Sequence, residues 1–227
     1  MAVIGHFIAM CLAVANGGGR HIIFVKDMRK YILGHVGKMV CYATGTMLVK
    51  ISILLFYHRV FPQKPILIVS CLIGTIVILY NIALVLVVSL QCIPLSSIWT
   101  DRPGRCIDKS KPTTALAQVA PFHTTHCAIN LFTDVATFAI PIKPVLGLKM
   151  RITRKLQVLA AFLLGGIVCV FGVIRTVVLS RMKPGDASQG DIFPGIWSVS
   201  EMSIGVVAAY LFYEEPKIDA AISKFHG

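Results

Sequence analysis

Residues 66–90 read ILIVSCLIGTIVILYNIALVLVVSL and contain no Asp, Glu, Lys, Arg or His. As an α-helix this stretch is roughly 37 Å long at about 1.5 Å per residue, whereas the hydrocarbon core of a bilayer is only about 30 Å thick. A buried helix of a water-soluble domain does not need so long an uncharged run. The stretch therefore predicts a helix that crosses a membrane.

Five further apolar stretches follow the same logic with a few polar interruptions. Together they predict an all-α, polytopic transmembrane helix bundle with six spans, at residues 2–16, 33–57, 66–90, 116–142, 156–180 and 193–213. The first stretch is short, and its Ala13-Val14-Ala15 also resembles the cleavage site of a secretory signal. No basic segment precedes it, so a membrane span is favoured over a signal peptide.

The composition agrees with a membrane bundle. The chain is 56% hydrophobic and 14% charged, whereas soluble domains are about 25% charged. A length of 227 residues suits one transmembrane domain over residues 1–227. The net charge of +12 lies in short loops between apolar stretches, which indicates contact with the anionic headgroups of a lipid bilayer and no nucleic-acid partner.

The loops set an expected orientation in the plasma membrane or an endomembrane. Residues 143–155 hold five basic residues and no acidic one, so we expect them to be cytoplasmic and available to a cytoplasmic partner. The loops 17–30 and 91–112 then face the other side. The second of these carries Cys92 and Cys106, and we predict a disulfide between them because that side is oxidising.

Four ionisable residues lie inside the predicted spans, where a charge is costly and usually has a partner. They are Lys50, Asp134, Arg175 and Glu201. Estimated depths sort them into an inner pair, Lys50 with Asp134, and an outer pair, Arg175 with Glu201. Two alternatives stay open: the basic side chains extend towards the headgroups, or the charges take part directly in ligand binding or transport.

The fourth predicted span carries a polar stripe within an arc of about 100° on a helical wheel. Its members are His123, His126, Asn130, Thr133, Asp134 and Thr137. Such a stripe faces neighbouring helices or a cavity rather than lipid. A metal site would need a third strong ligand that is not identifiable. We therefore predict an intramembrane polar network of Lys50, His126, Asn130, Asp134, Arg175 and Glu201, with no catalytic, metal or cofactor-binding motif.

Several strings, in order along nearly the whole chain, resemble the fungal rhodopsin-domain integral membrane proteins. This group includes satratoxin-cluster-type proteins and relatives of Pth-type receptor-like proteins. The matching strings are Gly17-Gly18-Gly19-Arg20-His21, residues 50–61 (KISILLFYHRVF), Gln91-Cys92-Ile93-Pro94 with Trp99 and Cys106, Asn130 with Thr133-Asp134, Pro141-Ile142, Arg175, Trp197-Ser198 with Glu201, and Gly205-Val206-Val207-Ala208-Ala209.

The resemblance implies a seven-span architecture with an outside N-terminus, and it aligns the first span here with the second of the family. It thus implies that the family's first helix has no counterpart in this chain. Residues 211–216 (LFYEEP) also depart from the Pro-Leu-Arg-Pro-like stretch that is usual there. Microbial-type opsins hold retinal on a lysine of the last helix; residues 193–213 contain none, so we expect no retinal.

The leading hypothesis is a receptor-like, small-molecule-binding membrane protein. One alternative is a membrane enzyme of secondary metabolism, such as a cyclase that uses Asp134 and Glu201 as acids. A paired carboxylate is held ionised and is a poor proton donor, so Lys50 and Arg175 argue against this role. The other alternative is a metabolite exporter, for which discontinuous helices in matching halves would be the expected signal.

Overall fold

The structure of the protein, a computed structural model, describes residues 1–16, 18, 27–60, 63–90, 92–93, 105–106, 112–142, 152–180 and 192–225. The long helices are α1 (Ala2–Ala15), α2 (Met28–Val60), α3 (Lys64–Leu90), α4 (Pro112–Ala139), α6 (Ile152–Ser180) and α8 (Ile192–Phe225). Two short strands, β1 (Cys92–Ile93) and β2 (Arg105–Cys106), pair antiparallel between α3 and α4.

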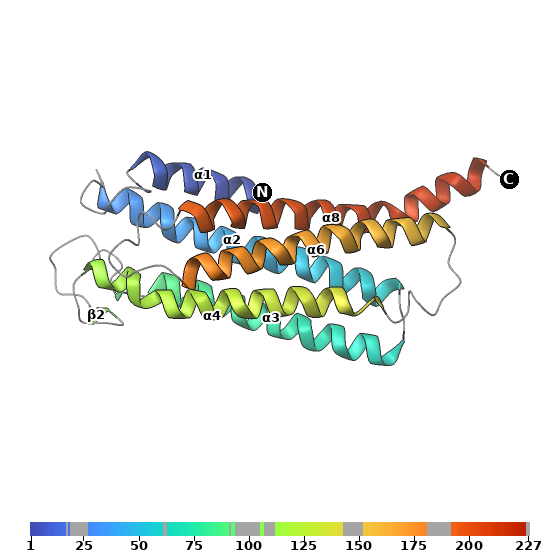
Figure 1. Cartoon of the computed structure of the whole chain (residues 1–227), viewed down its shortest axis with the longest axis horizontal. Helices are drawn as coiled ribbons and strands as arrows, with labels where there is room; N and C mark the ends of the chain where they lie inside the picture. Colours follow the sequence, from blue (N-terminus) through green and yellow to red (C-terminus); the bar gives the residue numbers. More distant parts are fainter. Residues whose placement is uncertain are drawn as a thin grey trace.

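The helices run side by side along the long axis of the molecule (Figure 1). Their packing forms a closed ring, because α2 contacts α3, α3 contacts α4, α4 contacts α6, α6 contacts α8, and α8 returns to α2. Helix α1 lies outside this ring and packs against α2 and α8. The ring places α2, α4, α6 and α8 around a common interior, and the candidate site lies there.

The predicted all-α bundle is confirmed, and each predicted span corresponds to one of these helices, although the predicted spans 2–16 and 116–142 run past the ends of α1 and α4. The largest difference is at the end of α8, which continues to Phe225 although the last span was expected to end near residue 213. Glu214 and Glu215 mark the end of the apolar run, but charge does not end a helix. Figure 1 shows the final part of α8 bending away from its first part, and the helix contains Pro216, which removes one backbone hydrogen bond.

Two helix starts have local explanations. The side chain of Asp27 accepts a hydrogen bond of 3.2 Å from the backbone N–H of Lys30, as a residue capping the N-terminus of α2 does. This backbone hydrogen bond lowers the pKa of the Asp27 carboxyl below its usual value. Helix α4 starts at Pro112, where the missing N–H costs nothing because the first turn has no acceptor for it.

The described surface of the bundle is apolar. Leu72, Leu79 and Leu86 recur every seven residues on α3 and are each more than half exposed, while the opposite face of the helix is buried. Two helices, Arg29–Arg59 and Lys64–Leu90, are long and apolar enough to cross a membrane, and Ala2–Ala15 and Leu163–Val178 are shorter apolar helices. Apolar side chains outside and charges inside are the arrangement that lipid favours.

One close contact fixes the spacing of α4 and α6. Gly165 of α6 lies directly against the ring of Phe138, and a Cβ at residue 165 would overlap that ring. A Cβ at the next residue, Gly166, would meet nothing within 4 Å. Small residues of this kind let membrane helices approach closely. The contact brings α6 to the ring interior beside Asp134 and its neighbours on α4.

Candidate functional site

Lys50 of α2 is buried in a shell of oxygen atoms. Its Nζ lies 3.0 Å from Asp134 Oδ1, 2.7 Å from Thr133 Oγ1, 3.2 Å from the Tyr80 hydroxyl, and 2.9 Å from both the backbone and side-chain oxygens of Asn130. An ammonium has only three N–H donors, so five oxygens are more than it needs. The charge of Lys50 is therefore fully compensated by α3 and α4.

Asn130 of α4 is fully buried and uses both ends of its amide. Its Oδ1 accepts from Lys50 and, at 3.0 Å, from the hydroxyl of Tyr80. Its Nδ2 donates to Asp134 Oδ2 at 3.2 Å and to Glu201 Oε1 at 2.7 Å. The amide orientation follows from these partners, because the reverse would point NH₂ at an ammonium. Asn130 thus links the charges of α2 and α4 to those of α8.

Arg175 of α6 and Glu201 of α8 form a second buried pair, with 3.5 Å between Nη1 and Oε2. The same Nη1 lies 3.3 Å from the hydroxyl of Ser198, and the guanidinium carbon lies 4.5 Å above the ring of Tyr42. The Tyr42 hydroxyl donates to Glu201 Oε1 at 3.0 Å. Among the described residues, Arg175 Nε, Arg175 Nη2 and Glu201 Oε2 have no hydrogen-bond partner. The second pair is therefore less completely coordinated than the first.

Helical spacing explains how α4 supplies so many of these groups. Asn130, Thr133, Asp134 and Thr137 fall at steps of three and four along the helix, and all four are buried. The hydroxyl of Thr137 donates back to the carbonyl oxygen of Thr133 at 2.7 Å, so it is satisfied without a partner on another helix. The predicted polar stripe therefore lies on the face of α4 that points into the ring.

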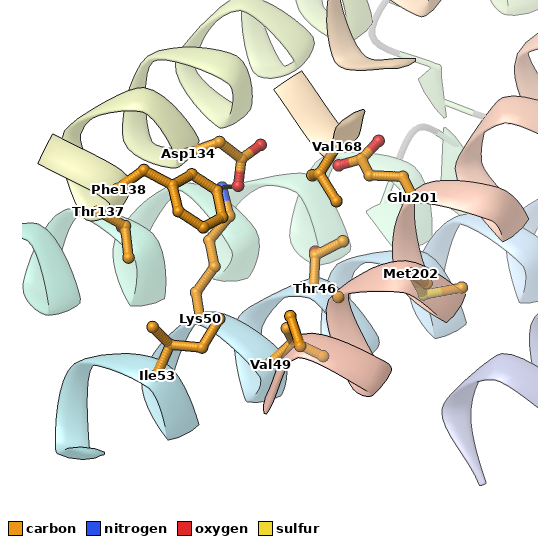
Figure 2. Close-up of a pocket in the computed structure, with 12 residues that line it drawn as sticks. Thr46, Val49, Lys50, Ile53, Asp134, Thr137, Phe138, Val168, Glu201 and Met202 are labelled. Carbon is orange, nitrogen blue, oxygen red and sulfur yellow. Dashed lines mark ion pairs between the residues drawn. The ribbon is translucent and has the colours of Figure 1, made fainter. Parts of the chain in front are cut away.

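A small cavity adjoins the network. It is lined by Lys50, Asp134, Thr137 and Glu201 on its polar side, and by apolar residues such as Val168 elsewhere. Figure 2 shows Lys50 from α2 reaching towards Asp134 from α4, with Glu201 entering from α8. The free volume is about 30 Å³, which is enough for about two water molecules. The cavity could hold solvent or the end of a small polar group.

The structure brings together five of the six predicted network residues through hydrogen bonds and ion pairs. His126 is buried beside them, with its ring centroid 4.9 Å from Tyr80 and 6.4 Å from Tyr42. From the sequence, the inner and outer pairs were expected to be separate contacts. In the structure, hydrogen bonds from Asn130 to Asp134 and Glu201 join the two pairs. The side chain of His123 lies outside the described residues.

Three residues of the network were not predicted from the sequence. Tyr42 and Tyr80 supply hydroxyls to the network, and Ser198 contacts Arg175. Tyrosine in a membrane helix is common, so its presence alone indicated nothing. The usable signal was the hydroxyl itself, because a buried Tyr O–H usually finds a partner.

The backbone places the two loop cysteines opposite each other. In the antiparallel pair of β1 and β2, Cys92 is in register with Cys106. Opposite residues in such a pair have Cα atoms about 4.5–5.5 Å apart, which lies within the range that a disulfide spans. Their sulfur atoms lie outside the described residues, so the disulfide stays a prediction.

Most of the loops on which the expected orientation rests lie outside the described residues. These are residues 17–30 and 91–112 apart from the parts named above, residues 143–151, and residues 181–191. Within the described part of the chain, no three His, Cys, Asp or Glu residues are grouped as metal ligands. The orientation and the cytoplasmic partner therefore remain predictions.

A helical bundle with an apolar surface and buried charges defines the class: a helical membrane protein. The sequence model of the fungal rhodopsin domain matches residues 1–218, so the chain belongs to the fungal rhodopsin domain family. This match confirms the resemblance seen in the sequence.

Three relatives illustrate the family. The chain is 28% identical over 203 residues to a SAT4 family membrane protein of Emericella nidulans, covering 86% of this chain and 48% of the relative. It is 27% identical over 169 residues to the satratoxin biosynthesis SC1 cluster protein 4 of Stachybotrys chartarum, covering 73% and 58%. It is 27% identical over 164 residues to the receptor GIN3 of Arthrobotrys oligospora, covering 71% and 38%.

The chain spans about half the length of the curated relatives it matches. No solved structure matches it.

Proposed function

We propose that this protein is a receptor-like, multi-pass membrane protein that binds a small molecule without retinal. The observation that carries the proposal is the convergence of charged side chains from α2, α4, α6 and α8 on one buried network beside a cavity. A charge at this depth is costly, and intramembrane ionisable residues commonly mark ligand or ion sites.

The network suits a receptor because it connects helices that a ligand could move. Lys50 ties α2 to α4, Asn130 ties α4 to α8, and Arg175 ties α6 to α8. A ligand that contacts any of these groups differently in two arrangements of the helices would shift the balance between them. The basic segment 143–155, proposed to be cytoplasmic, is the part of the chain that would meet a partner.

The relative from Arthrobotrys oligospora supports this reading, since its name describes a receptor. It shares only part of its length with this chain, so its activity is carried over here as a proposal alone.

The contacts of Lys50 and the lack of a lysine in residues 193–213 both argue against a retinal Schiff base. A Schiff base needs an amine that is free to react, whereas the Lys50 amine lies 3.0 Å from a carboxylate and within 3.2 Å of four further oxygens. Residues 193–213 of the last helix contain no lysine.

A membrane enzyme or an exporter of secondary metabolism is the second candidate. The name of the Stachybotrys relative places that protein with satratoxin biosynthesis, and this favours such a role. Against acid catalysis, Asp134 lies 3.0 Å from Lys50 and Glu201 lies 3.5 Å from Arg175. Each carboxylate is therefore already engaged in an ion pair with a neighbouring cation.

The test uses the full chain in lipid nanodiscs and in liposomes, with fractions of an organic extract from a filamentous fungus as the probe. If the protein is a receptor, a component of one fraction binds to it and raises its unfolding temperature. The component is then recovered chemically unchanged. Asn130→Ala should lose this stabilisation, whereas Gly166→Ala should keep it. Chemical conversion of the component would show an enzyme, and its accumulation across the liposome membrane an exporter; either result overturns the proposal.

A further inference from the structure

The guanidinium of Arg175 presents one edge that the protein does not use. Its Nη1 contacts Ser198 and Glu201, whereas its Nε and Nη2 have no hydrogen-bond acceptor among the described residues. Arg175 is only 3% exposed, so bulk water does not reach this edge freely. Leaving donors of a buried charged group unsatisfied costs more than leaving neutral ones.

We infer that the Nε–Nη2 edge of Arg175 binds the carboxylate of a small-molecule ligand. This inference rests on the proposed function and names the class of ligand: an organic acid with an apolar body. The Nε and Nη2 hydrogens lie on one side of the planar guanidinium and point in parallel. This fork matches the two oxygens of a carboxylate, which is the geometry of the strongest Arg contacts.

The orientation of the edge is fixed by its surroundings. The central carbon of the guanidinium lies over the Tyr42 ring, 4.5 Å from its centroid, and Ser198 and Glu201 hold the Nη1 end. A guanidinium held by these contacts cannot turn freely. The edge is therefore set in place before any ligand arrives, which reduces the entropy lost on binding.

The two cations of the network differ in this respect. Lys50 has five oxygens around three donors, so it has no capacity for a ligand. Arg175 has one carboxylate near it, and that carboxylate also accepts hydrogen bonds from Tyr42 and Asn130 through its other oxygen. Lys50 is thus saturated by the protein, while Arg175 keeps two donors for a partner.

A carboxylate fits these donors better than water or an amine. A single water offers its acceptor lone pairs but no charge, so it compensates the guanidinium only in part. An amine carries donors and the wrong sign of charge. A carboxylate supplies two acceptors and one negative charge, and the apolar residues that line the cavity beside Glu201, such as Val168, suit the hydrocarbon part of such an acid.

A natural reporter lies beside the proposed site. The ring of Trp197 packs on Phe171 with 5.0 Å between centroids. Phe171 precedes Arg175 by one helical turn, and Trp197 precedes Ser198, so a ligand at the Arg175 edge would change the surroundings of this indole. The chain has two tryptophans, and Trp99→Phe leaves Trp197 as the single one.

The experiment titrates the Trp99→Phe protein in nanodiscs with three probes that share one tail: hexanoate, hexanol and hexylammonium. We expect a saturable change in Trp197 fluorescence and a rise in unfolding temperature with hexanoate alone. Arg175→Lys keeps the charge but loses the fork, and we expect it to weaken hexanoate binding about tenfold or more. Thr176→Val changes a neighbour whose hydroxyl donates to the carbonyl oxygen of Gly172 in its own helix, and this variant should bind as the parent does.

Several results would overturn the inference. Equal binding of hexanol and hexanoate would show that the tail decides, and equal hexanoate binding by Arg175→Lys would place the site elsewhere. Saturable binding of hexylammonium alone, lost in Glu201→Gln, would assign the site to that carboxylate and leave a ligand-binding receptor intact. No response to any probe would exclude the Arg175 edge, while the extract experiment would still decide the proposed function. If Arg175→Lys does not fold, the three probes on the parent protein decide the question.

Discussion

The amide nitrogen of Asn130 lies 2.7 Å from Glu201 Oε1, and this hydrogen bond joins α4 to α8 across the interior of the ring. Through it, the Lys50–Asp134 pair and the Arg175–Glu201 pair become one network rather than two separate contacts.

Removing the Asn130 amide should destabilise the fold more than any single hydroxyl. Asn130→Ala removes one acceptor from Lys50 and one hydrogen-bond donor from each of Asp134 and Glu201, so we expect a loss of roughly 2–4 kcal/mol of unfolding free energy. Thermal unfolding in detergent micelles measures it. Ser200→Ala is the control, because among the described residues its hydroxyl bonds to Ile196 of its own helix and to no other helix. Equal effects of the two variants would contradict a central role for Asn130.

The Lys50–Asp134 pair should show strong coupling in a double-mutant cycle. Lys50→Met leaves Asp134 buried without its cation, and Asp134→Asn leaves the ammonium without its carboxylate, so each single change should cost about 3–5 kcal/mol. The double variant removes both charges and should cost less than the sum of the two. Folded yield and unfolding temperature are the measurements. Additive losses would mean that the two residues act independently.

The contact between α4 and α6 should be sensitive to one added methyl group. Gly165→Ala would force Phe138 to move, and we expect it to cost about 1–3 kcal/mol, as overpacking usually does. Gly166→Ala adds the same group where nothing lies within 4 Å, so it should change stability little. Unfolding curves of the two variants side by side provide the comparison. A loss in Gly166→Ala as large as that in Gly165→Ala would refute the packing argument.

We expect Cys92 and Cys106 to form a disulfide. Mass mapping of non-reduced peptides should recover the two cysteines in one linked species. In the chain-entropy model, closing a loop of this length stabilises by roughly 3 kcal/mol, and Cys92→Ser with Cys106→Ser should lose about that amount. Recovery of both as free thiols would show that the register of β1 and β2 is not used for a bond.

The orientation predicted from the basic segment 143–155 is open to direct labelling. In a variant whose seven native cysteines are replaced by serine, a cysteine placed by Lys109→Cys should react with an impermeant reagent added to intact cells, and one placed by Lys149→Cys should react only after the membrane is opened. Expression levels of the two variants serve as the control. The reverse pattern would invert the topology and would move Cys92 and Cys106 into a reducing compartment.

Long uncharged runs made the helices predictable, because a stretch such as 66–90 has the length and composition of a membrane-spanning helix. The opposite signs and matching depths of Lys50 and Asp134 suggested which charges meet. The coupling through Asn130 could not be foreseen, since the hydrogen bond between Asn130 and Glu201 joins residues 71 positions apart and depends on how α4 and α8 are rotated about their axes. Periodicity gives the face of a helix but not the neighbour that it meets.

The end of α8 shows a different limit. The apolar run stops near residue 213, and hydropathy alone placed the end of the helix there. The backbone continues helical to Phe225, because residues such as Glu, Lys and Ala favour helix wherever the chain leaves the apolar layer. Hydropathy locates the part of a helix that suits lipid, not the ends of the helix.

The closed ring of helices has a consequence for how the protein is made. Ribosomes synthesise α2 first among the ring helices and α8 last, so the contact between α2 and α8 cannot form until α8 has been made. The contact of Lys50 with Asn130 cannot form until Asn130 has been synthesised, 80 residues later. The ion pair of Arg175 cannot form until Glu201 of α8 has been made. During that interval each charge lacks its partner, so it needs a polar environment outside the finished bundle. The last helix therefore closes the ring, and insertion and assembly must overlap in time.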